Sequence, residues 1–451
     1  MKRAAILLML LPGVYAQDRR TVKEPKIPPR CTTLTANLVS QGATIAASDE
    51  TKLDTARIQH ALDTCKPGQA VTLQANGGPD AFLTGPLDLR AGVTLVVDKG
   101  AILFGSRNPR DYDVEPGVCG TITERGHGCR AMINGSRVTS AGVMGDGIID
   151  GRGGYPILGQ SITWWDLAEK ARAGGVQNNP RIMTLSGCDD FTLYRIQLRN
   201  SPNFHVSYSG GHGFTAWGVI VNAPRNARNT DGINPGNSTD VTITRSFIHA
   251  GDDNVAIKAP QGEPTSHMTI AHNHFYAGHG MSIGSETDGG ASAIRVSDLS
   301  IDGADNGIRI KSNFTRGGSV HDIEYEDVCI RNTKNPVMMD SHYTAGYSPA
   351  KDKLPHFTDI RLKNVRVSGS GTVTLEGYDA LHLLGIRFDN VVFENPGLVK
   401  LKAAYADVTA GPGPFNLRPS GNEVKIAGAA GEGPPNACAD KWVPFPVPIS
   451  Q

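Results

Sequence analysis

The sequence predicts an all-β fold, a single right-handed parallel β-helix of about ten coils with an N-terminal capping helix. Three observations lead to this fold class. An eight-residue pattern of alternating apolar residues returns along the chain, its runs are β-branched and bounded by Gly, Asn or Asp, and 53 of the 451 residues are glycine, well above the usual ~7%. Short β-branched runs between turn residues indicate strands rather than helices.

The repeat is clearest from the middle of the chain onward. Its copies are 23 to 37 residues apart and start at Phe191, Phe214, Val241, Met268, Ile294, Ile323, Ile360 and Ile386. A unit of this length buries its apolar face only by stacking on its neighbours, which is the property of a solenoid. A leucine-rich repeat would need a fixed Leu and Asn frame, which is absent, and a β-propeller blade needs about 40 residues.

The chain divides into three parts along its length. Residues 1–16 resemble a signal peptide, because Lys2 and Arg3 precede an apolar stretch that ends in small residues. Residues 17–408 are expected to form the β-helix domain, and residues 409–451, rich in Gly and Pro, an irregular tail. The protein is therefore expected to be secreted.

Two helices are expected within the β-helix domain. The first spans residues 50–65, where Leu53, Ile58 and Leu62 share one face, and it covers the open end of the solenoid. The second, shorter helix covers residues 164–172 and lies on a loop.

Seven cysteines follow the signal peptide, and export permits disulfides. The spacing favours two bridges, Cys31–Cys65 and Cys119–Cys129. Because seven is odd, at least one thiol stays free. Cys188 and Cys329 lie in strand-like sequence and are expected to be buried thiols.

Charge and hydropathy exclude some classes of function. The chain has 44 Lys plus Arg and 44 Asp plus Glu, so its net charge is zero, which argues against a nucleic-acid partner. Apart from the signal peptide, no run reaches the ~18 apolar residues that span a membrane. We expect a monomer without a membrane partner.

The residues that can carry chemistry gather between residues 229 and 343. Asp231, Asp252, His279 and Arg309 follow one another at intervals of 21, 27 and 30 residues, each close to one coil. Residues one coil apart stack at roughly 4.8 Å, so these clusters should form one column rather than separate sites. A column of this kind suits a linear polymer.

The composition of the column predicts acid–base chemistry on a sugar polymer. Hydrolysis of a glycosidic bond needs one carboxylic acid and one carboxylate. Asp252 and Asp253 can serve one site only at a bend, which Gly251 favours. Crowding of Asp231 with this pair should raise the pKa of at least one carboxyl group. Arg309 and Lys311 share a strand face and can hold a substrate carboxylate.

Most of these residues also have a structural interpretation. An isolated Asp-Gly or Asp-Asp pair is more often a turn, and only the shared spacing favours a site. The histidines at 267, 272 and 274 are spaced irregularly, so no metal and no cofactor is expected. The pair Trp164-Trp165 is equally consistent with a sugar-stacking platform and with packing of its loop.

The four clusters NTDG, GDDN, GHG and RIK, which start at Asn229, Gly251, Gly278 and Arg309, resemble those of polygalacturonases, glycoside hydrolase family 28. The similarity is greatest to secreted bacterial endo-acting members and extends from Arg20 to about residue 395. It implies a right-handed β-helix that hydrolyses α-1,4-linked galacturonic acid of pectin with inversion and without a metal.

The resemblance also implies roles for individual residues. Asp252 would be the general acid, Asp231 and Asp253 would position and deprotonate water, and His279 would tune the protonation of the acid. The residues that would bind substrate are Asn229, Arg309, Lys311 and Tyr343, with Lys258 and His205 as weaker candidates for the wall of the cleft. The alternatives are an exo-acting polygalacturonase, a Ca²⁺-dependent pectate lyase, and a non-catalytic polysaccharide-binding β-helix.

Overall fold

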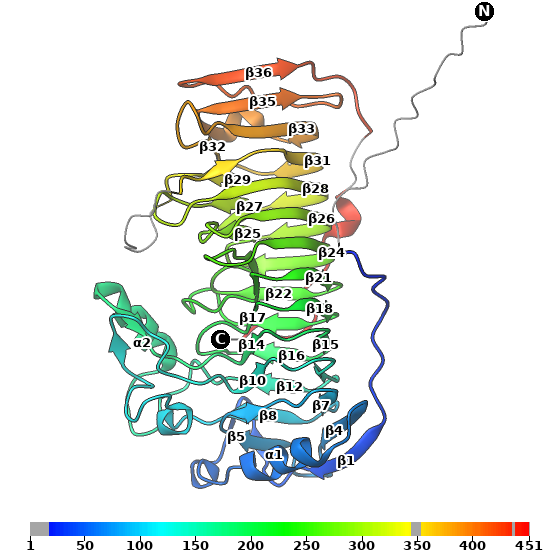
Figure 1. Ribbon diagram of the computed structural model, residues 1–451, viewed down its shortest axis with the longest axis vertical. Coiled ribbons are helices and arrows are strands. Elements are labelled where there is room, and N and C mark those ends of the chain that lie inside the picture. Colours follow the sequence, from blue (N-terminus) through cyan, green and yellow to red (C-terminus); the bar gives the residue numbers. More distant parts are fainter. Residues whose placement is uncertain (1–17, 344–352, 435–437, 451) are drawn as a thin grey trace, which may run out of the picture.

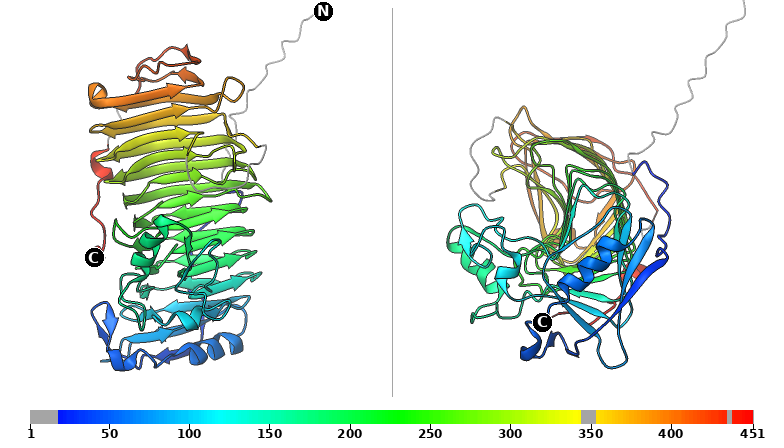
Figure 2. Two further views of the ribbon diagram at one scale, coloured as in Figure 1. Left: turned by 90° about the vertical axis from the view of Figure 1, so that its left-hand side faces the viewer. Right: turned by 60° about the horizontal axis from the view of Figure 1, so that its bottom comes forward.

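The computed structural model describes residues 18–343, 353–434 and 438–450, which form a solenoid of parallel strands (Figures 1 and 2). The predicted fold class is confirmed. The predicted signal peptide, residues 1–16, lies outside the described residues. Among the described residues, no helix is long and apolar enough to cross a membrane.

The larger of the two main sheets has 21 strands and contains all eight copies of the repeat. Its strands are β1 (Arg30–Thr35), β4 (Gln69–Gln74), β5 (Ala81–Thr84), β7 (Val93–Val97), β8 (Ile102–Gly105), β11 (Gly142–Met144), β12 (Ile148–Asp150), β15 (Thr192–Tyr194), β16 (Gln197–Arg199), β18 (His212–Trp217), β19 (Ile220–Asn222), β21 (Thr239–Thr244), β22 (Phe247–Ala250), β24 (Thr265–Ala277), β26 (Ala291–Asp302), β28 (Ser319–Arg331), β30 (His356–Phe357), β31 (Ile360–Ser368), β33 (Leu384–Phe393), β35 (Ala406–Ala410) and β36 (Val424–Gly428).

The register of this sheet follows the sequence repeat. The first apolar residue of each copy pairs with that of the next, from Phe214 with Val241 to Ile360 with Ile386. These side chains are buried in the interior of the solenoid, where they form one continuous hydrophobic core. A shift by one residue would turn this apolar row toward the other face, so the pattern determines the register.

A backbone corner recurs once per coil between the two halves of the repeat. The residue at this corner has a left-handed conformation, with φ between 49° and 61° at Arg195, Arg245, His272, Asp298, Asp327, Asn364 and Asn390. Asn, Asp and His are the side chains that tolerate this region best. The corners also bond to each other, since Asn390 donates to Asn364 at 2.9 Å and Asn364 to Asp327 at 3.1 Å.

The second main sheet has 11 strands, close to the predicted ten coils, and carries the candidate site. Its strands are β6 (Leu87–Asp88), β10 (Ile133–Ser136), β14 (Met183–Ser186), β17 (Val206–Ser209), β20 (Ile233–Gly236), β23 (Val255–Ile257), β25 (Met281–Gly284), β27 (Asn306–Lys311), β29 (Asn335–Asp340), β32 (Gly371–Glu376) and β34 (Val399–Ala404). Two short antiparallel pairs, β2 (Ser40–Gln41) with β3 (Thr44–Ile45) and β9 (Ile122–Thr123) with β13 (Val176–Gln177), lie outside the solenoid.

Both predicted helices are present. α1 (Thr55–Thr64) lies at the end of the solenoid and buries Ile58 and Leu62, although Leu53 precedes the helix and is exposed (Figure 2). α2 (Trp164–Lys170) begins with a capping box between Thr163 and Asp166. It lies on an arm beside the solenoid (Figure 1). Short 3₁₀ helices cover Ala47–Asp49, Pro109–Tyr112, Ala171–Ala173, Pro396–Leu398 and Ala439–Lys441.

The two predicted disulfides form, but a third was not predicted. Cys31 pairs with Cys65 and Cys119 with Cys129, and Cys188 is a free, buried thiol. The prediction that Cys329 is a buried thiol is wrong, because it bonds to Cys438, 109 residues later. The alternating pattern of a strand predicts which side chains point inward. It does not predict that the C-terminal segment returns to β28, where Cys329 lies.

The segment after residue 408 is more ordered than an irregular tail. β36 pairs with β35 and continues the apolar row of the repeat, because Val408 pairs with Ile426. Phe415 stacks on Phe388 with ring centroids 4.3 Å apart. The last described residues then run back along the outside of the solenoid, where Asn222 donates to the Pro448 carbonyl at 2.8 Å (Figure 1).

Candidate active site

The predicted site residues converge at the second main sheet, on successive coils. Asp231 precedes β20, Asp253 precedes β23 and His279 precedes β25, in each case by two residues. Ile233 pairs with Val255, and Val255 with Met281, so these three residues occupy equivalent positions. The predicted column is therefore present, although Arg309 lies further along its coil, opposite Ser282.

A bend at Gly251 brings both neighbouring aspartates into this site. A side chain at Gly251 would meet the Ala227 carbonyl oxygen at 2.1 Å, so the two loops approach as closely as they do only because this residue is glycine. Beyond the bend the two carboxylates differ in exposure. The Asp252 side chain is 20% exposed and that of Asp253 is 2% exposed.

Asp253 is held by two cations and a hydroxyl group. Arg309 Nη1 lies 3.1 Å from its Oδ1, Lys311 Nζ 2.9 Å from its Oδ2, and Ser282 Oγ donates to Oδ1 at 2.7 Å. Burial alone would raise the pKa of Asp253, but the charges of Lys311 and Arg309 hold it well below the usual range. Asp253 is therefore a permanent carboxylate.

Asp252 shares a hydrogen bond with His279. His279 Nδ1 lies 3.0 Å from Asp252 Oδ1, and its Nε2 lies 3.8 Å from Asp305 Oδ2. Burial lowers the pKa of His279, but the bond to Asp252 and its charge outweigh this effect and raise the pKa overall. The same bond lowers the pKa of Asp252 against the opposing effect of burial. The pair is thus an imidazolium–carboxylate pair at mildly acidic pH.

Asp231 is the carboxyl group that keeps a proton. Its side chain is buried, Asn234 Nδ2 donates to Oδ2 at 2.8 Å, and Oδ1 has no partner among the described residues. Burial and the negative charge of Asp252 raise the pKa of Asp231 to about 7. The expectation that crowding raises one carboxyl pKa holds, but the raised group in the free protein is Asp231 rather than the predicted acid, Asp252.

Two predicted substrate-binding residues lie next to these groups. Asn229 Nδ2 is 3.4 Å from Asp252 Oδ2. The Tyr343 ring lies over the cations, with its centroid 5.2 Å from the Arg309 guanidinium carbon and 5.3 Å from Lys311 Nζ. Both side chains are therefore placed beside the carboxylates and cations that the sequence grouped together.

The two weaker candidates differ from each other. Lys258 is half-buried, 3.6 Å from Glu286 and 5.6 Å from the Phe204 ring centroid. His205 is fully buried, and its Nδ1 lies 3.0 Å from the Asp231 carbonyl oxygen. Burial lowers the pKa of His205 to about 4, so this ring is neutral. His205 therefore supports the backbone of Asp231 and is not exposed at the surface, in contrast to its predicted place in the wall of the cleft.

Three residues of the site were not among the predicted ones. Ser282 and Asn234 bond directly to Asp253 and Asp231, and Gln177 Nε2 donates to Asn229 Oδ1 at 2.9 Å. Ser282 and Asn234 each follow a predicted residue by three positions, so an outward position on the next strand could have indicated them. Gln177 comes from the arm that carries α2, and nothing in the sequence relates it to the column.

The site also contains a possible set of metal ligands. Ligand atoms of Asp252, Asp253 and His279 lie within 4.8 Å of one another. Both oxygens of Asp253, however, are bonded to Arg309, Lys311 or Ser282. A divalent cation would have to displace these partners and accept two positive neighbours, so the donor set fits a carboxylate–cation cluster better than a metal centre.

Comparison with known proteins gives consistent results. Residues 37–411 match the family described as glycosyl hydrolases family 28. The chain is 42% identical over 428 residues to a polygalacturonase of Ralstonia nicotianae, covering 83% of this chain and 80% of that protein. It is 40% identical over 392 residues to an endo-polygalacturonase of Pectobacterium parmentieri, covering 86% and 93%. The solved polygalacturonase from Erwinia carotovora ssp. carotovora superposes with a TM-score of 0.80 at 39% identity, covering 87% of this chain and 100% of that one.

Proposed function

Because the chain belongs to glycosyl hydrolase family 28, we propose that the carboxylate cluster hydrolyses the α-1,4 linkages of polygalacturonate with inversion at the anomeric carbon. The activity is that of an endo-polygalacturonase. The observation that carries the mechanism is the contrast among three neighbouring carboxyl groups: Asp253 is permanently ionised, Asp252 is partly exposed, and Asp231 keeps a proton up to about pH 7. Inversion requires one carboxylic acid and one carboxylate on opposite sides of the scissile bond.

Asp252 is the group that protonates the leaving oxygen. It is the most exposed of the three carboxyl groups, so it alone can reach a bound sugar without rearrangement. An anionic substrate that covers Asp252 removes water and adds negative charge, and both effects raise the pKa of Asp252. Since Asp231 and Asp252 interact, protonation of Asp252 in turn lowers the pKa of Asp231. Substrate binding thereby moves the proton of the pair to Asp252 and leaves Asp231 ionised.

Asp231 and Asp253 then act on the attacking water. The Asp252 proton goes to the glycosidic oxygen as the C–O bond breaks, the water oxygen bonds to the anomeric carbon, and the released water proton goes to Asp231. Asp253, fixed by Arg309 and Lys311, orients the water and stabilises the positive charge that develops on the sugar. The step ends with Asp252 ionised and Asp231 protonated, which is the state of the free protein, and the hydrogen bond from His279 stabilises the Asp252 carboxylate.

Arg309 and Lys311 bind the carboxylate of the sugar next to the scissile bond. Each uses only one described hydrogen bond for Asp253, and a guanidinium has five donors and an ammonium three. Tyr343 covers both cations and Asn229 touches Asp252, so these two side chains limit where a sugar ring can lie.

The proposal also includes that the protein is exported and acts as a monomer. Three disulfides among the described residues favour an oxidising compartment, in agreement with a signal peptide at residues 1–16. Polygalacturonate outside the cell is then the partner of the protein, and a single chain contains every residue named in the site.

The proposal is tested with the purified protein and polygalacturonate. We expect release of reducing ends with a rapid fall in viscosity, mixed oligomers in a brief digestion, and a β-anomer as the first product in proton NMR spectra. Release of monomer alone from the chain end would indicate an exo enzyme. Unsaturated products that disappear with a chelator would indicate a lyase, and binding without reducing-end release a non-catalytic protein.

A further inference from the structure

The C-terminal segment, residues 438–450, follows a single row of the larger sheet along the outside of the solenoid (left view of Figure 2). The row consists of residues that pair with one another from strand to strand: Asn222 with His249, His249 with Tyr276, Tyr276 with Asp302 and Asp302 with Arg331. The strand neighbours Ile248 and Phe275 belong to the core, so the row itself faces outward. The segment therefore crosses successive strands at one fixed position of the coil.

Contacts with this row fix both ends of the segment. Near its start, Trp442 lies over Arg331, whose guanidinium carbon is 4.3 Å from the ring centroid. At its end, Asn222 Nδ2 donates to the Pro448 carbonyl at 2.8 Å, and Asn222 Oδ1 accepts a bond from the Ser450 backbone N–H at 3.0 Å. These contacts hold the segment independently of the disulfide at its first residue.

Phe445 packs against two members of the row at once. Its ring centroid lies 5.7 Å from that of His249 and 5.2 Å from that of Tyr276, which it meets edge to face. The Tyr276 hydroxyl also donates to the Val443 carbonyl at 2.8 Å, so the segment contacts both ends of this side chain. The rings of two neighbouring strands are thus held together from outside.

The backbone around Phe445 is stiff. Proline occupies positions 444, 446 and 448, and each proline fixes its own φ and restricts the preceding residue to an extended conformation. A proline-rich segment of this kind behaves as a semi-rigid spacer. Because it is already extended, the segment loses little conformational entropy when Phe445 packs on the strands.

The two strands under Phe445 lead directly into the carboxylate cluster. His249 lies near the end of β22, three residues before Asp252, and Tyr276 lies near the end of β24, three residues before His279. Asp252 and His279 share the hydrogen bond of 3.0 Å that governs the protonation of both groups. The geometry of this bond therefore depends on where the ends of β22 and β24 lie.

Further hydrogen bonds connect these strand ends to the loops of the cluster. Asn254 Nδ2 donates to the Tyr276 carbonyl at 3.3 Å, and Asn254 Oδ1 accepts the Gly280 N–H at 2.8 Å. His249 Nδ1 donates at 2.7 Å to the carbonyl of Ala223, which begins the loop before β20. A displacement of either strand end is thereby passed on to the loops.

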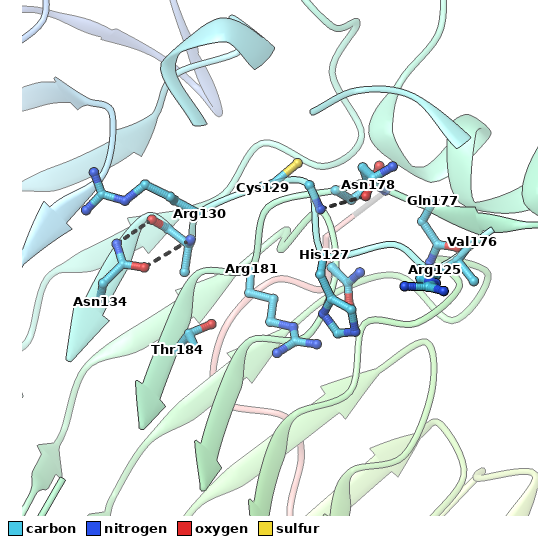
Figure 3. A pocket seen from close by; sticks show the side chains of 14 residues that line it. Arg125, His127, Cys129, Arg130, Asn134, Val176, Gln177, Asn178, Arg181 and Thr184 are labelled. Carbon is cyan, nitrogen blue, oxygen red and sulfur yellow. Dashed lines mark hydrogen bonds between the residues drawn. The ribbon is translucent and has the colours of Figure 1, made fainter. Parts of the chain in front are cut away.

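The loop before β20 is held by a second element as well. Gln177, which lies on the arm and is labelled in Figure 3, donates to Asn229 in this loop at 2.9 Å. Among the described residues, no side chain of the arm bonds to Asp252 or His279. The C-terminal segment is therefore the outer support of the strands that carry these two residues.

We propose that Phe445 is a positioning residue, which sets the alignment of Asp252 and His279 by packing on His249 and Tyr276. The inference rests on the proposed function, because it concerns the geometry of the same acid and histidine. The described contacts of the segment go to the larger sheet, so Phe445 acts through the strands. A misplacement of about 1 Å can lower turnover by up to about 10²-fold, even when the substitution lies far from the reacting atoms.

The test measures kcat and KM of Phe445→Ala on polygalacturonate, well below the melting temperature of the variant. We expect kcat to fall about tenfold and KM to stay within about twofold of wild type, because the alignment changes while the substrate-binding residues do not. Phe445→Tyr keeps the ring at the half-buried position and should retain at least about half of the wild-type kcat.

Trp442→Ala is the matched control. Trp442 is an aromatic residue of the same segment, is half-buried like Phe445, and packs on Arg331 at the end of β28. The loop between β28 and β29 carries no residue of the cluster. Each variant loses one aromatic contact, so both should lower the melting temperature by similar amounts, whereas only Phe445→Ala should lower kcat.

A second variant tests the same contact if Phe445→Ala does not fold. Tyr276→Phe removes only the hydroxyl that donates to Val443 and leaves the ring in place. We expect its kcat to fall about two- to threefold at unchanged KM, since one of the two contacts that hold Tyr276 is lost.

Three results would overturn the positioning role while leaving the proposed function intact. The first is an unchanged kcat of folded Phe445→Ala, or of Tyr276→Phe in its place. The second is an equal loss of kcat in Trp442→Ala, which would indicate general destabilisation, and the third is a rise of KM alone, which would indicate direct contact with substrate. If the proposed function itself failed, wild type would release no reducing ends from polygalacturonate.

Discussion

Three aspartates of this site have the same side chain and three different protonation behaviours. Asp253 lies between two cations, Asp252 bonds to an imidazole and is partly exposed, and Asp231 is buried next to the charge of Asp252. The pKa of each group is determined by its neighbours rather than by its chemical type. Such a separation of pKa values provides an acid and a base in one cluster.

Substitution of either carboxyl group that exchanges the proton should strongly reduce turnover. We expect Asp252→Asn and Asp231→Asn each to lower kcat by about 10²–10⁴-fold, the contribution of one general acid or base, because an amide neither donates nor accepts this proton. Reducing-end assays measure the effect, with the melting temperature as the control for folding. Near-normal turnover of either folded variant would contradict the assignment.

Asp231 should make the stability of the protein depend on pH. Its folded pKa of about 7 lies above the ~3.9 of an unfolded aspartate, so its stabilising contribution is complete below about pH 4 and is lost as the pH rises to about 7. Asp231→Asn removes this dependence. The melting temperature of the variant should therefore gain on that of wild type between pH 4 and pH 8. A constant difference across this range would contradict the raised pKa.

The same proton should limit activity at high pH. Above about pH 7 neither Asp231 nor Asp252 holds a proton in the free protein, and kcat/KM should fall. A profile of kcat/KM from pH 4 to pH 9 checks this. Activity that stays constant to pH 9 would show that the proton comes from another group.

Lys311 should contribute mainly to substrate binding. Lys311→Ala removes a charge from the site but no group that transfers a proton, so KM for polygalacturonate should rise more than kcat falls. Steady-state kinetics separate the two effects, and Lys99→Ala, an exposed lysine of the described chain far from the cluster, serves as the control. A collapse of kcat at unchanged KM would assign Lys311 a different role. Loss of the Lys311 side chain also removes one of the two cations that contact Asp253.

At the scale of single elements, the strands of the larger sheet owe their register to apolar rows and their ends to left-handed corners. The C-terminal segment is held differently, by the Cys329–Cys438 disulfide, the pair Lys441–Asp298 and packing of Phe445 on His249 and Tyr276. This segment thus crosses several coils and ties them together outside the hydrogen-bonded ladder.

Loss of the third disulfide should lower stability without affecting catalysis. Cys438→Ser opens a loop of 109 residues, and we expect the free energy of unfolding to fall by about 2–4 kcal/mol while kcat stays unchanged. Denaturant unfolding measures the difference. The double variant Cys329→Ser/Cys438→Ser should lose no more than about 1 kcal/mol beyond the single one. Unchanged stability of the single variant would show that the bridge does not constrain the chain.

At the scale of the whole molecule, the solenoid places residues that are one repeat apart in the sequence next to each other in a straight row. Equivalent residues of successive coils lie roughly 4.8 Å apart, so a groove of any length can be built from side chains that are 20–30 residues apart in the chain. The carboxylate cluster lies on that row, because Asp231, Asp253 and His279 hold equivalent positions on successive coils.

The periodic part of the protein followed from the sequence. Alternating apolar runs at coil-length intervals predicted the strands, their stacking and the approach of Asp231, Asp252, Asp253, His279 and Arg309, because each depends on local pattern and one spacing. The resemblance to a family added the roles of these residues. Glycine at 251 even indicated the bend at the aspartate pair.

Only the tertiary structure decided what depends on unrelated segments coming together. Burial and the charge of Asp252 place the raised pKa on Asp231, the return of the tail pairs Cys329 with Cys438, and the arm of α2 brings Gln177 to Asn229. The burial of a side chain, the charges around it and its disulfide partner all depend on which residues are its neighbours in space. A repeat specifies neighbours within its own ladder, whereas contacts made by loops and tails have no period from which to predict them.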